Sequence, residues 1–394
     1  MPPLQMGDIF MTFNITELTR HGVFIADGGT GTMLQARGLG SEGTETWCLT
    51  HPEEVLRLHS EYLAAGAMWL KTNTFGANSI KYPEGGEFDL KALIFAAVNL
   101  AKQAVEQAGK AGEIPVLMSV GPTGRLLEPY GDLPFEQAVA IFRQAVAWGA
   151  WAGADAVLIE TFCDTGEARA AIIAAKEAAP GLPFLCSLTF EENGRLLSGA
   201  TPAAAVAILE GMGVAAIGVN CGAGPARALQ VLPEIAAAAH APVIANPNVG
   251  LPRVENGRTI FDLSPENFAA QCEELLALGA SILGGCCGTT PAHIAALKAR
   301  LGDKKMPPPQ GPEEGSPPEE VIASPRQVIA LSECAIDALE EYDPEEPGFA
   351  PVKITCDDPV RLEALLREYD GRALVIAPDW AGDLVQKYGG ILRR

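Results

Sequence analysis

The chain has 394 residues, of which 48% are hydrophobic and 20% charged, a composition typical of a globular protein with one large domain or several smaller ones. Acidic residues outnumber basic residues 49 to 28, and the formal net charge of −21 disfavours binding to nucleic acid or to anionic membrane surfaces. No apolar run reaches the ~18 residues of a membrane span, and the N-terminus lacks the layout of an export signal. The nine cysteines are therefore predicted to be reduced thiols, used for metal binding or chemistry in the cytoplasm.

Eight short apolar segments, each followed by a helical pattern, are spaced along residues 24–302. Most are continuous apolar runs, which are typical of parallel strands buried on both faces. We expect strands at residues 24–28, 67–75, 115–122, 156–162, 183–190, 215–222, 242–250 and 281–288. Eight such strand–helix units predict a (β/α)8 barrel, the TIM barrel. A doubly wound open sheet is the alternative, but no GxGxxG motif follows the first strand and no Walker loop is found.

The helical segments carry recognisable start and stop signals. In residues 264–279, Ser264 is the expected N-cap, Pro265 the first helical residue and Gly279 the residue that ends the helix. The segments at residues 51–66, 201–213 and 290–302 also place a proline at the start. These signals support the alternation of strands and helices that a barrel requires.

The alternation stops near residue 303. Residues 304–325 are rich in Pro and Glu and predict an extended linker between a barrel at residues 1–303 and a small α/β module at residues 326–394. In the module we expect strands at residues 326–331, 351–356 and 372–377 and a helix at residues 358–370. No chemical motif assigns it a role. Because few contacts are expected across such a boundary, the barrel is predicted to fold without residues 306–394.

Three of the nine cysteines lie at the carboxyl ends of predicted strands, where the active sites of such barrels are found. Cys221 ends the sixth strand, and Cys286 and Cys287 end the eighth. Neighbouring strand residues point to opposite faces, but the flanking glycines would let the chain turn so that both sulfurs reach one cation. Three thiolates favour zinc, which takes soft sulfur ligands and can keep a fourth position open for substrate. The alternative is that these cysteines are merely small buried hydrophobic residues.

Several motifs together resemble the zinc-dependent homocysteine S-methyltransferase family. They are DGGTGTMLQARG, KTNTFGAN, IETF, GVNCG and GGCCGTTPAHI, in the family's order between residues 22 and 302. Within the family, DGGTGTMLQ and TNTFGANSIK are most similar to the homocysteine-binding module of cobalamin-dependent methionine synthase. The folate- and cobalamin-binding modules of that enzyme have no counterpart in this sequence, so the methyl donor stays open.

The resemblance implies a role for each matching residue. The residues that match the family's zinc ligands are Cys221, Cys286 and Cys287. Asp27 and Glu160 match acids near the homocysteine amino group, and the backbone amides of Gly28, Gly29 and Thr30 are similar to the loop that receives the substrate carboxylate. The residue types agree with these roles, because a Gly-rich turn exposes N–H groups to an anion and buried acids suit an ammonium.

The implied reaction is the transfer of a methyl group to the zinc-bound thiolate of homocysteine, which gives methionine. A free thiol is largely protonated near neutral pH, and binding to zinc would favour the deprotonated, nucleophilic form of the homocysteine thiol. The expected donor is a methyl-corrinoid on a separate protein, and the alternative is S-methylmethionine or a betaine-type donor. A competing function is that of a non-catalytic zinc–thiolate subunit or sensor, although structural zinc sites usually have a fourth protein ligand.

The seventh strand lies between the two cysteine-bearing strands and ends in Asn246 and Asn248. Asn248 lies further toward the mouth, so its amide oxygen is the candidate for the fourth zinc ligand before homocysteine arrives. A neutral oxygen is a poor ligand for a three-thiolate zinc and should yield easily to substrate. The alternative is a water in that position, with both asparagines capping the turn.

Overall fold

The computed structural model describes residues 13–393, apart from residues 21, 39–42, 252, 256–257, 306–319, 345–347 and 349. All eight expected barrel strands are present and form one parallel sheet. They are β1 (Phe24–Ile25), β2 (Leu70–Lys71), β3 (Val116–Val120), β4 (Ala156–Phe162), β5 (Phe184–Leu188), β6 (Ile217–Cys221), β7 (Val243–Pro247) and β10 (Ile282–Leu283). Each lies inside its predicted range.

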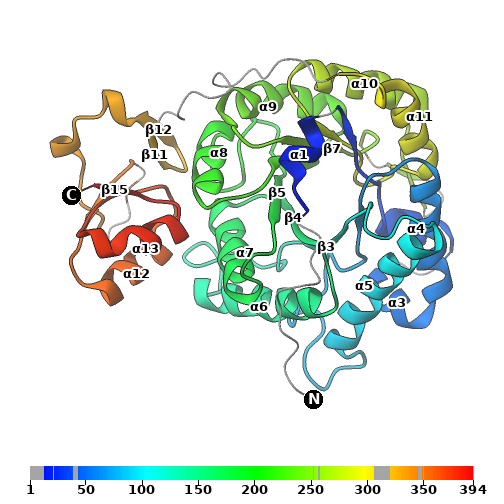
Figure 1. Ribbon diagram of the computed structural model, residues 1–394, viewed down its shortest axis with the longest axis horizontal. Coiled ribbons are helices and arrows are strands. Elements are labelled where there is room, and N and C mark those ends of the chain that lie inside the picture. Colours follow the sequence, from blue (N-terminus) through cyan, green and yellow to red (C-terminus); the bar gives the residue numbers. More distant parts are fainter. Residues whose placement is uncertain are drawn as a thin grey trace.

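The sheet curls round on itself (Figure 1). Its hydrogen-bonded order is β1, β10, β7, β6, β5, β4, β3, β2, which is the chain order read around a ring. At the two ends of that order, the backbone N–H of Met68 donates to the carbonyl of Ile25 at 2.7 Å, so the first two strands also meet. This confirms the predicted TIM-barrel type of α/β fold, because a doubly wound sheet would reverse its strand order in the middle.

Helices follow the strands and surround the sheet (Figure 1). They are α1 (Ile15–Arg20), α2 (Gly31–Ala36), α3 (Trp47–Thr50), α4 (Pro52–Ala64), α5 (Leu90–Gln107), α6 (Phe135–Trp151), α7 (Thr165–Ala178), α8 (Pro202–Gly211), α9 (Pro225–Ala238), α10 (Pro265–Ala277) and α11 (Pro291–Leu301), with a 3-10 turn η1 (Thr44–Thr46) and a hairpin of β8 (Arg253–Glu255) and β9 (Arg258–Ile260). The predicted N-cap of α10 is confirmed, because Ser264 Oγ accepts a hydrogen bond from the N–H of Asn267 at 3.3 Å. Within the described residues, no helix is both long and apolar enough to cross a membrane.

The alternation of side chains along the strands separates two apolar layers. In β4, Leu158 joins a buried cluster inside the barrel, whereas the neighbouring Val157 belongs to the layer between the strands and the helices. Phe24 at the start of β1, together with Phe13 and Ile15, belongs to the inner cluster. In Figure 1, α1 lies across the barrel. Apolar side chains thus fill the amino-terminal end of the barrel, and polar residues line the carboxyl end.

The C-terminal module contains two small sheets. Its elements are β11 (Val321–Ser324), β12 (Gln327–Ala330), η2 (Leu331–Glu333), η3 (Ile336–Ala338), β13 (Lys353–Thr355), α12 (Pro359–Glu368), β14 (Leu374–Ile376), η4 (Asp379–Ala381), α13 (Gly382–Lys387) and β15 (Ile391–Arg393). The three predicted strands and the helix are present. The predicted linker at residues 304–325 needs a correction at its end, because β11 pairs antiparallel with β12, and residues 306–319 lie outside the described residues.

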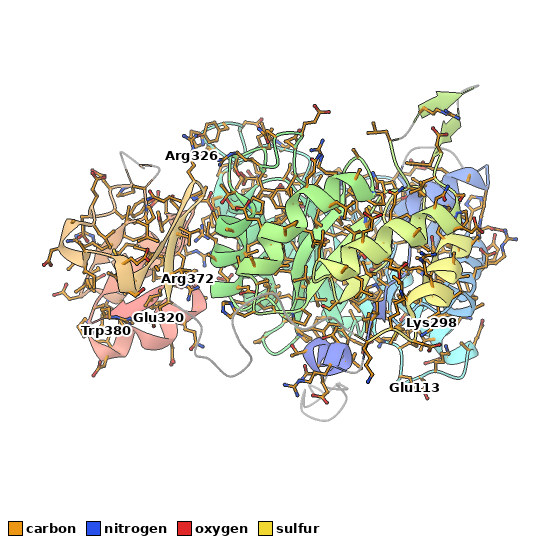
Figure 2. All side chains as sticks on the ribbon, turned by 90° about the horizontal axis from the view of Figure 1, so that it is seen from above. Glu113, Lys298, Glu320, Arg326, Arg372 and Trp380 are labelled. Carbon is orange, nitrogen blue, oxygen red and sulfur yellow. The ribbon has the colours of Figure 1, made fainter. Side chains whose placement is uncertain are left out.

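The module packs against the barrel, contrary to the expectation of few contacts. Arg169 of α7 is only 1% exposed, and its guanidinium donates to the carbonyl of Leu366 at 2.9 Å, near the end of α12. Arg367 forms ion pairs at 2.7 Å with Glu136 of α6 and with Glu177 of α7. Side chains fill the boundary in Figure 2. The Pro-rich segment therefore marks a change in composition but not the limit of packing.

The close approach of the two parts is also visible in their backbones. A Cβ atom at Gly211, the last residue of α8, would lie 2.8 Å from the carbonyl oxygen of Gly389 and 3.1 Å from Cδ of Arg372, which Figure 2 places at the boundary. The N–H of Thr201 donates to the carbonyl of Pro325 at 3.2 Å. Only a residue without a side chain fits at Gly211 without displacing the module.

Deleting residues 306–394 is expected to destabilise the barrel, because Arg169 would lose its carbonyl partners and the apolar surface around it would face water. Hydrogen bonds to charged groups contribute about 1.5–3 kcal/mol each, so we expect the thermal midpoint to fall by roughly 5–10 °C. Circular dichroism melts of the truncated and full chains measure the difference, with Arg367→Gln as a milder control. Equal midpoints would mean that the module does not support the barrel. The division near residues 303 and 326 stays a prediction.

Candidate metal and substrate site

Cys221, Cys286 and Cys287 come together at the carboxyl end of the barrel. Cys221 is the last residue of β6, and the other two follow β10. Their three Sγ atoms lie within 4.8 Å of one another, and this is the only such trio of potential metal ligands in the described part of the chain. A tetrahedral zinc with bonds of about 2.3 Å requires sulfur atoms ~3.8 Å apart, which this spacing approaches. The three thiols could therefore hold a metal ion.

Two residues at this cluster have left-handed backbone conformations, which turn the chain at the ends of β6 and β10. Cys221 has a φ of +60°, which is unusual for a residue with a Cβ and costs about 1–3 kcal/mol. Gly288, directly after Cys287, has a φ of +79°, which glycine adopts without strain. The N–H of Cys286 donates to the carbonyl of Pro247 at 3.0 Å and so ties the turn to the end of β7. The expectation that a flanking glycine turns the chain fits Gly288, whereas the strain at Cys221 was not predicted.

The three thiols perturb one another. Hydrogen bonds from Cys286 and then Cys287 lower the pKa of Cys221, and the hydrogen bond to Cys221 raises the pKa of each donor. The cluster thus holds a first negative charge readily, but a second and a third thiolate would lie beside it at short range. A bound cation is what would allow all three to ionise, so the chemistry of the donor set fits a metal ion.

Asn248, the residue proposed from the sequence as a fourth ligand, contacts the cysteine-bearing end of β6. Its N–H donates to the carbonyl of Cys221 at 3.3 Å, and its side-chain Nδ2 donates to the carbonyl of Gly222 at 2.7 Å. Its Oδ1 is buried and has no hydrogen-bond partner among the described residues. Asn246 also has a buried Oδ1 without such a partner. A buried amide oxygen normally finds a donor or a cation, so the unpartnered Oδ1 atoms of both asparagines fit a site completed by a ligand, and only Asn248 also contacts the backbone of Cys221 and Gly222.

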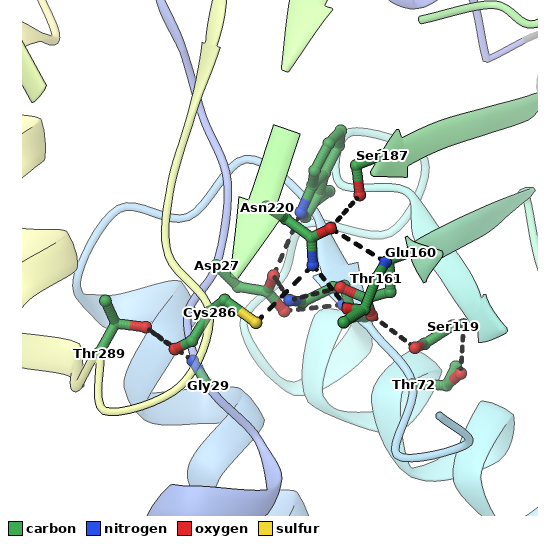
Figure 3. Close-up of polar contacts among 12 residues, drawn as sticks. Asp27, Gly29, Thr72, Ser119, Glu160, Thr161, Ser187, Asn220, Cys286 and Thr289 are labelled. Atoms are coloured by element: carbon green, nitrogen blue, oxygen red, sulfur yellow. Dashed lines mark hydrogen bonds and ion pairs between the residues drawn. The ribbon is translucent and has the colours of Figure 1, made fainter. Parts of the chain in front are cut away.

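Asn220 lies between Cys286 and the carboxyl ends of β4 and β5 (Figure 3). Its Nδ2 donates to Oγ1 of Thr161 at 2.7 Å and contacts Sγ of Cys286 at 3.7 Å. Its Oδ1 accepts from the N–H of Thr161 at 2.9 Å and from the hydroxyl of Ser187 at 3.0 Å. Thr161 has a φ of +69°, at an irregularity in the pairing of β4 and β5. Asn220 therefore stabilises a strained backbone next to Glu160 and positions Cys286.

Lys71 joins Asp27 and Glu160, the two acids expected near the substrate amino group. Its Nζ lies 3.4 Å from Oε2 of Glu160 and 3.9 Å from Oδ1 of Asp27. The other carboxylate oxygens are also held, because Ser119 donates to Oε1 of Glu160 at 2.5 Å and the N–H of Lys71 donates to Oδ2 of Asp27 at 2.7 Å. All four residues are buried. Figure 3 shows Asp27, Ser119 and Glu160 among the polar contacts of the site.

The charges of this group are only partly balanced. Burial raises the pKa of Asp27 to about 6, although the Lys71 ammonium acts to lower it. Burial alone would lower the pKa of Lys71, but the negative charges of Glu160 and Asp27 raise it above its ordinary value. Lys71 therefore stays protonated, and one positive charge faces two acids.

The loop at Gly28, Gly29 and Thr30, expected to receive a carboxylate, is only partly available. The N–H of Gly29 donates to Oγ1 of Thr289 at 2.9 Å, and the hydroxyl of Tyr62 donates to the carbonyl of Gly29 at 2.8 Å. For the N–H groups of Gly28 and Thr30, the described residues provide no such acceptor. Two of the three expected amides thus remain for an anion, and the third has a structural role.

Sequence reasoning did not identify Lys71 or Asn220 as site residues. A signal existed for Lys71, because it is the only charged residue of the apolar segment at residues 67–71, and a buried charge without a partner is costly. Asn220 has no comparable signal, since an asparagine before a cysteine is as common in a turn as in a site. Its role depends on the left-handed backbone of Thr161, which the sequence does not indicate.

The fold and the cluster together define an α/β-barrel protein whose active-site end could hold a metal ion. Comparison with known proteins identifies the family. The model of the homocysteine S-methyltransferase family matches residues 24–301, which include the whole barrel sheet. The chain therefore belongs to the homocysteine S-methyltransferase family, as its motifs indicated.

Individual relatives are consistent with this family assignment. The chain is 32% identical over 311 residues to a methionine synthase of Mycobacterium tuberculosis, and 32% identical over 314 residues to that of Mycobacterium leprae. Each match covers 75% of this chain and 26% of the relative, so the chain spans about a quarter of the length of these proteins. Among solved structures, the metallated form of the homocysteine methyltransferase MmuM from Escherichia coli superimposes with a TM-score of 0.62 at 29% identity, covering 72% of this chain and 98% of that one.

Proposed function

We propose that this chain transfers a methyl group to the sulfur of homocysteine, forming methionine, and that the donor is a methyl-corrinoid carried by a separate protein. The observation that carries the proposal is the cluster of Cys221, Cys286 and Cys287 at the barrel mouth, in a chain of the homocysteine S-methyltransferase family. The nine cysteines, all of which are free thiols, support a reducing compartment such as the cytoplasm.

Zinc is the proposed metal, because few other biological cations prefer thiolate ligands. Held by three cysteines, it would keep the thiol of homocysteine deprotonated and nucleophilic. Asn248 is proposed to provide the fourth ligand in the resting state. Its side-chain Nδ2 is held by the carbonyl of Gly222, and its Oδ1, which has no partner among the described residues, would be the ligand atom. The weak, neutral oxygen would give way to substrate.

The remaining site residues are proposed to orient the amino acid. Asp27 and Glu160 would hold its ammonium, which suits the incomplete charge balance around them. The N–H groups of Gly28 and Thr30 would receive its carboxylate. Asn220 would hold Cys286 in place through its Nδ2. These residues all lie at the carboxyl ends of strands, so substrate would enter from one face of the barrel.

The rim of that face supports a donor carried by a protein. Phe75, Tyr130, Leu197 and Leu251 lie in the loops that follow β2, β3, β5 and β7, and they are between 44% and 77% exposed. Exposed apolar side chains in the loops around the barrel mouth suit contact with a donor that is carried by a protein. A free small-molecule donor would need no such rim.

A donor comparison tests the proposal. Zinc-loaded protein is given homocysteine with a methyl-corrinoid protein, free methylcobalamin, S-methylmethionine or betaine, and methionine is measured. We expect turnover with both corrinoid donors. When Leu197 and Leu251 are both replaced by Ser, the rate with the methyl-corrinoid protein should fall, whereas the rate with free methylcobalamin should not change. Turnover only with S-methylmethionine or betaine would contradict the donor. Absence of turnover with any donor would favour the subunit or sensor.

A further inference from the structure

Lys71 places an ammonium group inside the substrate site. It is the last residue of β2, it is 5% exposed, and its Nζ approaches both proposed ammonium-binding acids, at 3.4 Å from Glu160 and 3.9 Å from Asp27. A buried lysine is rare unless it is paired, and here both of its partners are residues to which the proposed function assigns the substrate amino group.

The two acids cannot turn away from Lys71 to follow a second ammonium. Asp27 is held on one oxygen by Nε1 of Trp69 at 3.2 Å and on the other by the backbone N–H of Lys71 at 2.7 Å. Glu160 is held on its second oxygen by the hydroxyl of Ser119 at 2.5 Å. The long side chain of Lys71 is thus the adaptable member of the group. A substrate ammonium would share the acids with Lys71 or displace its Nζ.

We propose that Lys71 determines how strongly the chain selects for the α-amino group of its thiol substrate. With Lys71 present, the acids have one uncompensated negative charge, so an incoming ammonium gains less than it would between two bare carboxylates and meets a like charge nearby. A thiol that has the carboxylate but lacks the amino group is consequently tolerated. This inference rests on the proposed function and adds a specificity-determining residue to it.

The alternative is that Lys71 only fills the barrel interior as a structural ion pair. In that case its replacement by an apolar residue of similar length would change stability, since buried ion pairs are often neutral or costly compared with apolar isosteres. It would leave the relative affinity for thiols with and without an amino group unchanged. The two roles therefore differ in a ratio of affinities, which does not depend on turnover.

The test compares homocysteine with 4-mercaptobutanoate, which is the same molecule without the amino group. Dissociation constants for both thiols are measured by calorimetry on the zinc-loaded full chain. In the wild type we expect homocysteine to bind no more than about 100-fold more tightly. In Lys71→Met the preference should grow by about tenfold or more, which corresponds to ~1.4 kcal/mol. Lys71→Arg keeps the charge and should keep the wild-type ratio.

Two further variants make the result decisive. Lys71→Gln tests the same prediction with a polar end if Lys71→Met folds poorly, and Lys102→Met removes a lysine paired with Asp155 at 2.6 Å away from the site, so its ratio should not change. An unchanged ratio in both Lys71→Met and Lys71→Gln overturns the inference while the proposed function stands. If homocysteine fails to bind the zinc-loaded wild type, both are overturned.

Discussion

Replacing Cys221, Cys286 or Cys287 singly by Ala is expected to remove most of the bound zinc and essentially all methyl transfer, while the barrel stays folded. Each sulfur is one of three that lie within 4.8 Å of one another, so each loss leaves two protein thiolates, too few for a stable site. The barrel should persist because these cysteines lie at its carboxyl end, outside the apolar cluster that fills the other end. Zinc per chain, turnover and the thermal midpoint are the quantities to measure.

A matched control is available on the same face. Cys163 follows β4 directly and is a free, partly buried thiol that does not belong to the cluster. Cys163→Ala should keep both zinc and activity. Full activity in any one of the three cluster variants would remove that cysteine from the metal site.

Glu160→Gln is expected to raise the homocysteine concentration needed for half-saturation by about 10- to 100-fold. Glutamine can still accept the hydrogen bond from Ser119, but it loses the negative charge that faces Lys71 and, by the proposal, the substrate ammonium. Losing one partner of a desolvated charge pair costs about 2–5 kcal/mol, and the retained hydrogen bond offsets part of that cost. Initial rates over a range of homocysteine concentrations provide the measurement.

The control for this variant lies at the other end of the same segment. Asp155 directly precedes β4 and pairs with Lys102 at 2.6 Å, so Asp155→Asn removes a comparable charge away from the mouth. It should change stability but leave the homocysteine requirement as it is. If Glu160→Gln gives a wild-type half-saturation value, Glu160 does not bind the substrate.

The barrel could be predicted from the sequence because its signals are repetitive. Most strands are short apolar runs, and several helices have a start signal such as the Ser264–Pro265 pair at α10, so an error in one unit would not have changed the fold. The cysteine cluster was predictable for a related reason. Residues at the carboxyl ends of parallel strands converge, whatever the details of the loops.

The parts that were missed depend on tertiary structure. Thr161 and Cys221 both have left-handed backbone conformations, which neither residue type suggests, and at Thr161 two hydrogen bonds to the side chain of Asn220 hold that conformation. The packing of the module involves Arg169 of α7, which donates to a carbonyl of α12. Nothing in the sequence around Arg169 distinguishes it from an exposed helix residue. The pairing of β11 with β12 was missed because the composition of the neighbouring Pro- and Glu-rich stretch concealed a short strand.

By the proposed function, the three cysteines hold a zinc ion whose fourth position accepts the sulfur of homocysteine. Zinc-edge X-ray absorption of the zinc-loaded protein, recorded before and after homocysteine is added, tests it directly. We expect three sulfur neighbours and one oxygen neighbour at rest, with an oxygen shell altered in Asn248→Ala if that side chain is the ligand. On addition of homocysteine, the count should change to four sulfurs. A spectrum that homocysteine leaves unchanged would contradict the account, because it would mean a closed zinc site that does not bind the substrate sulfur.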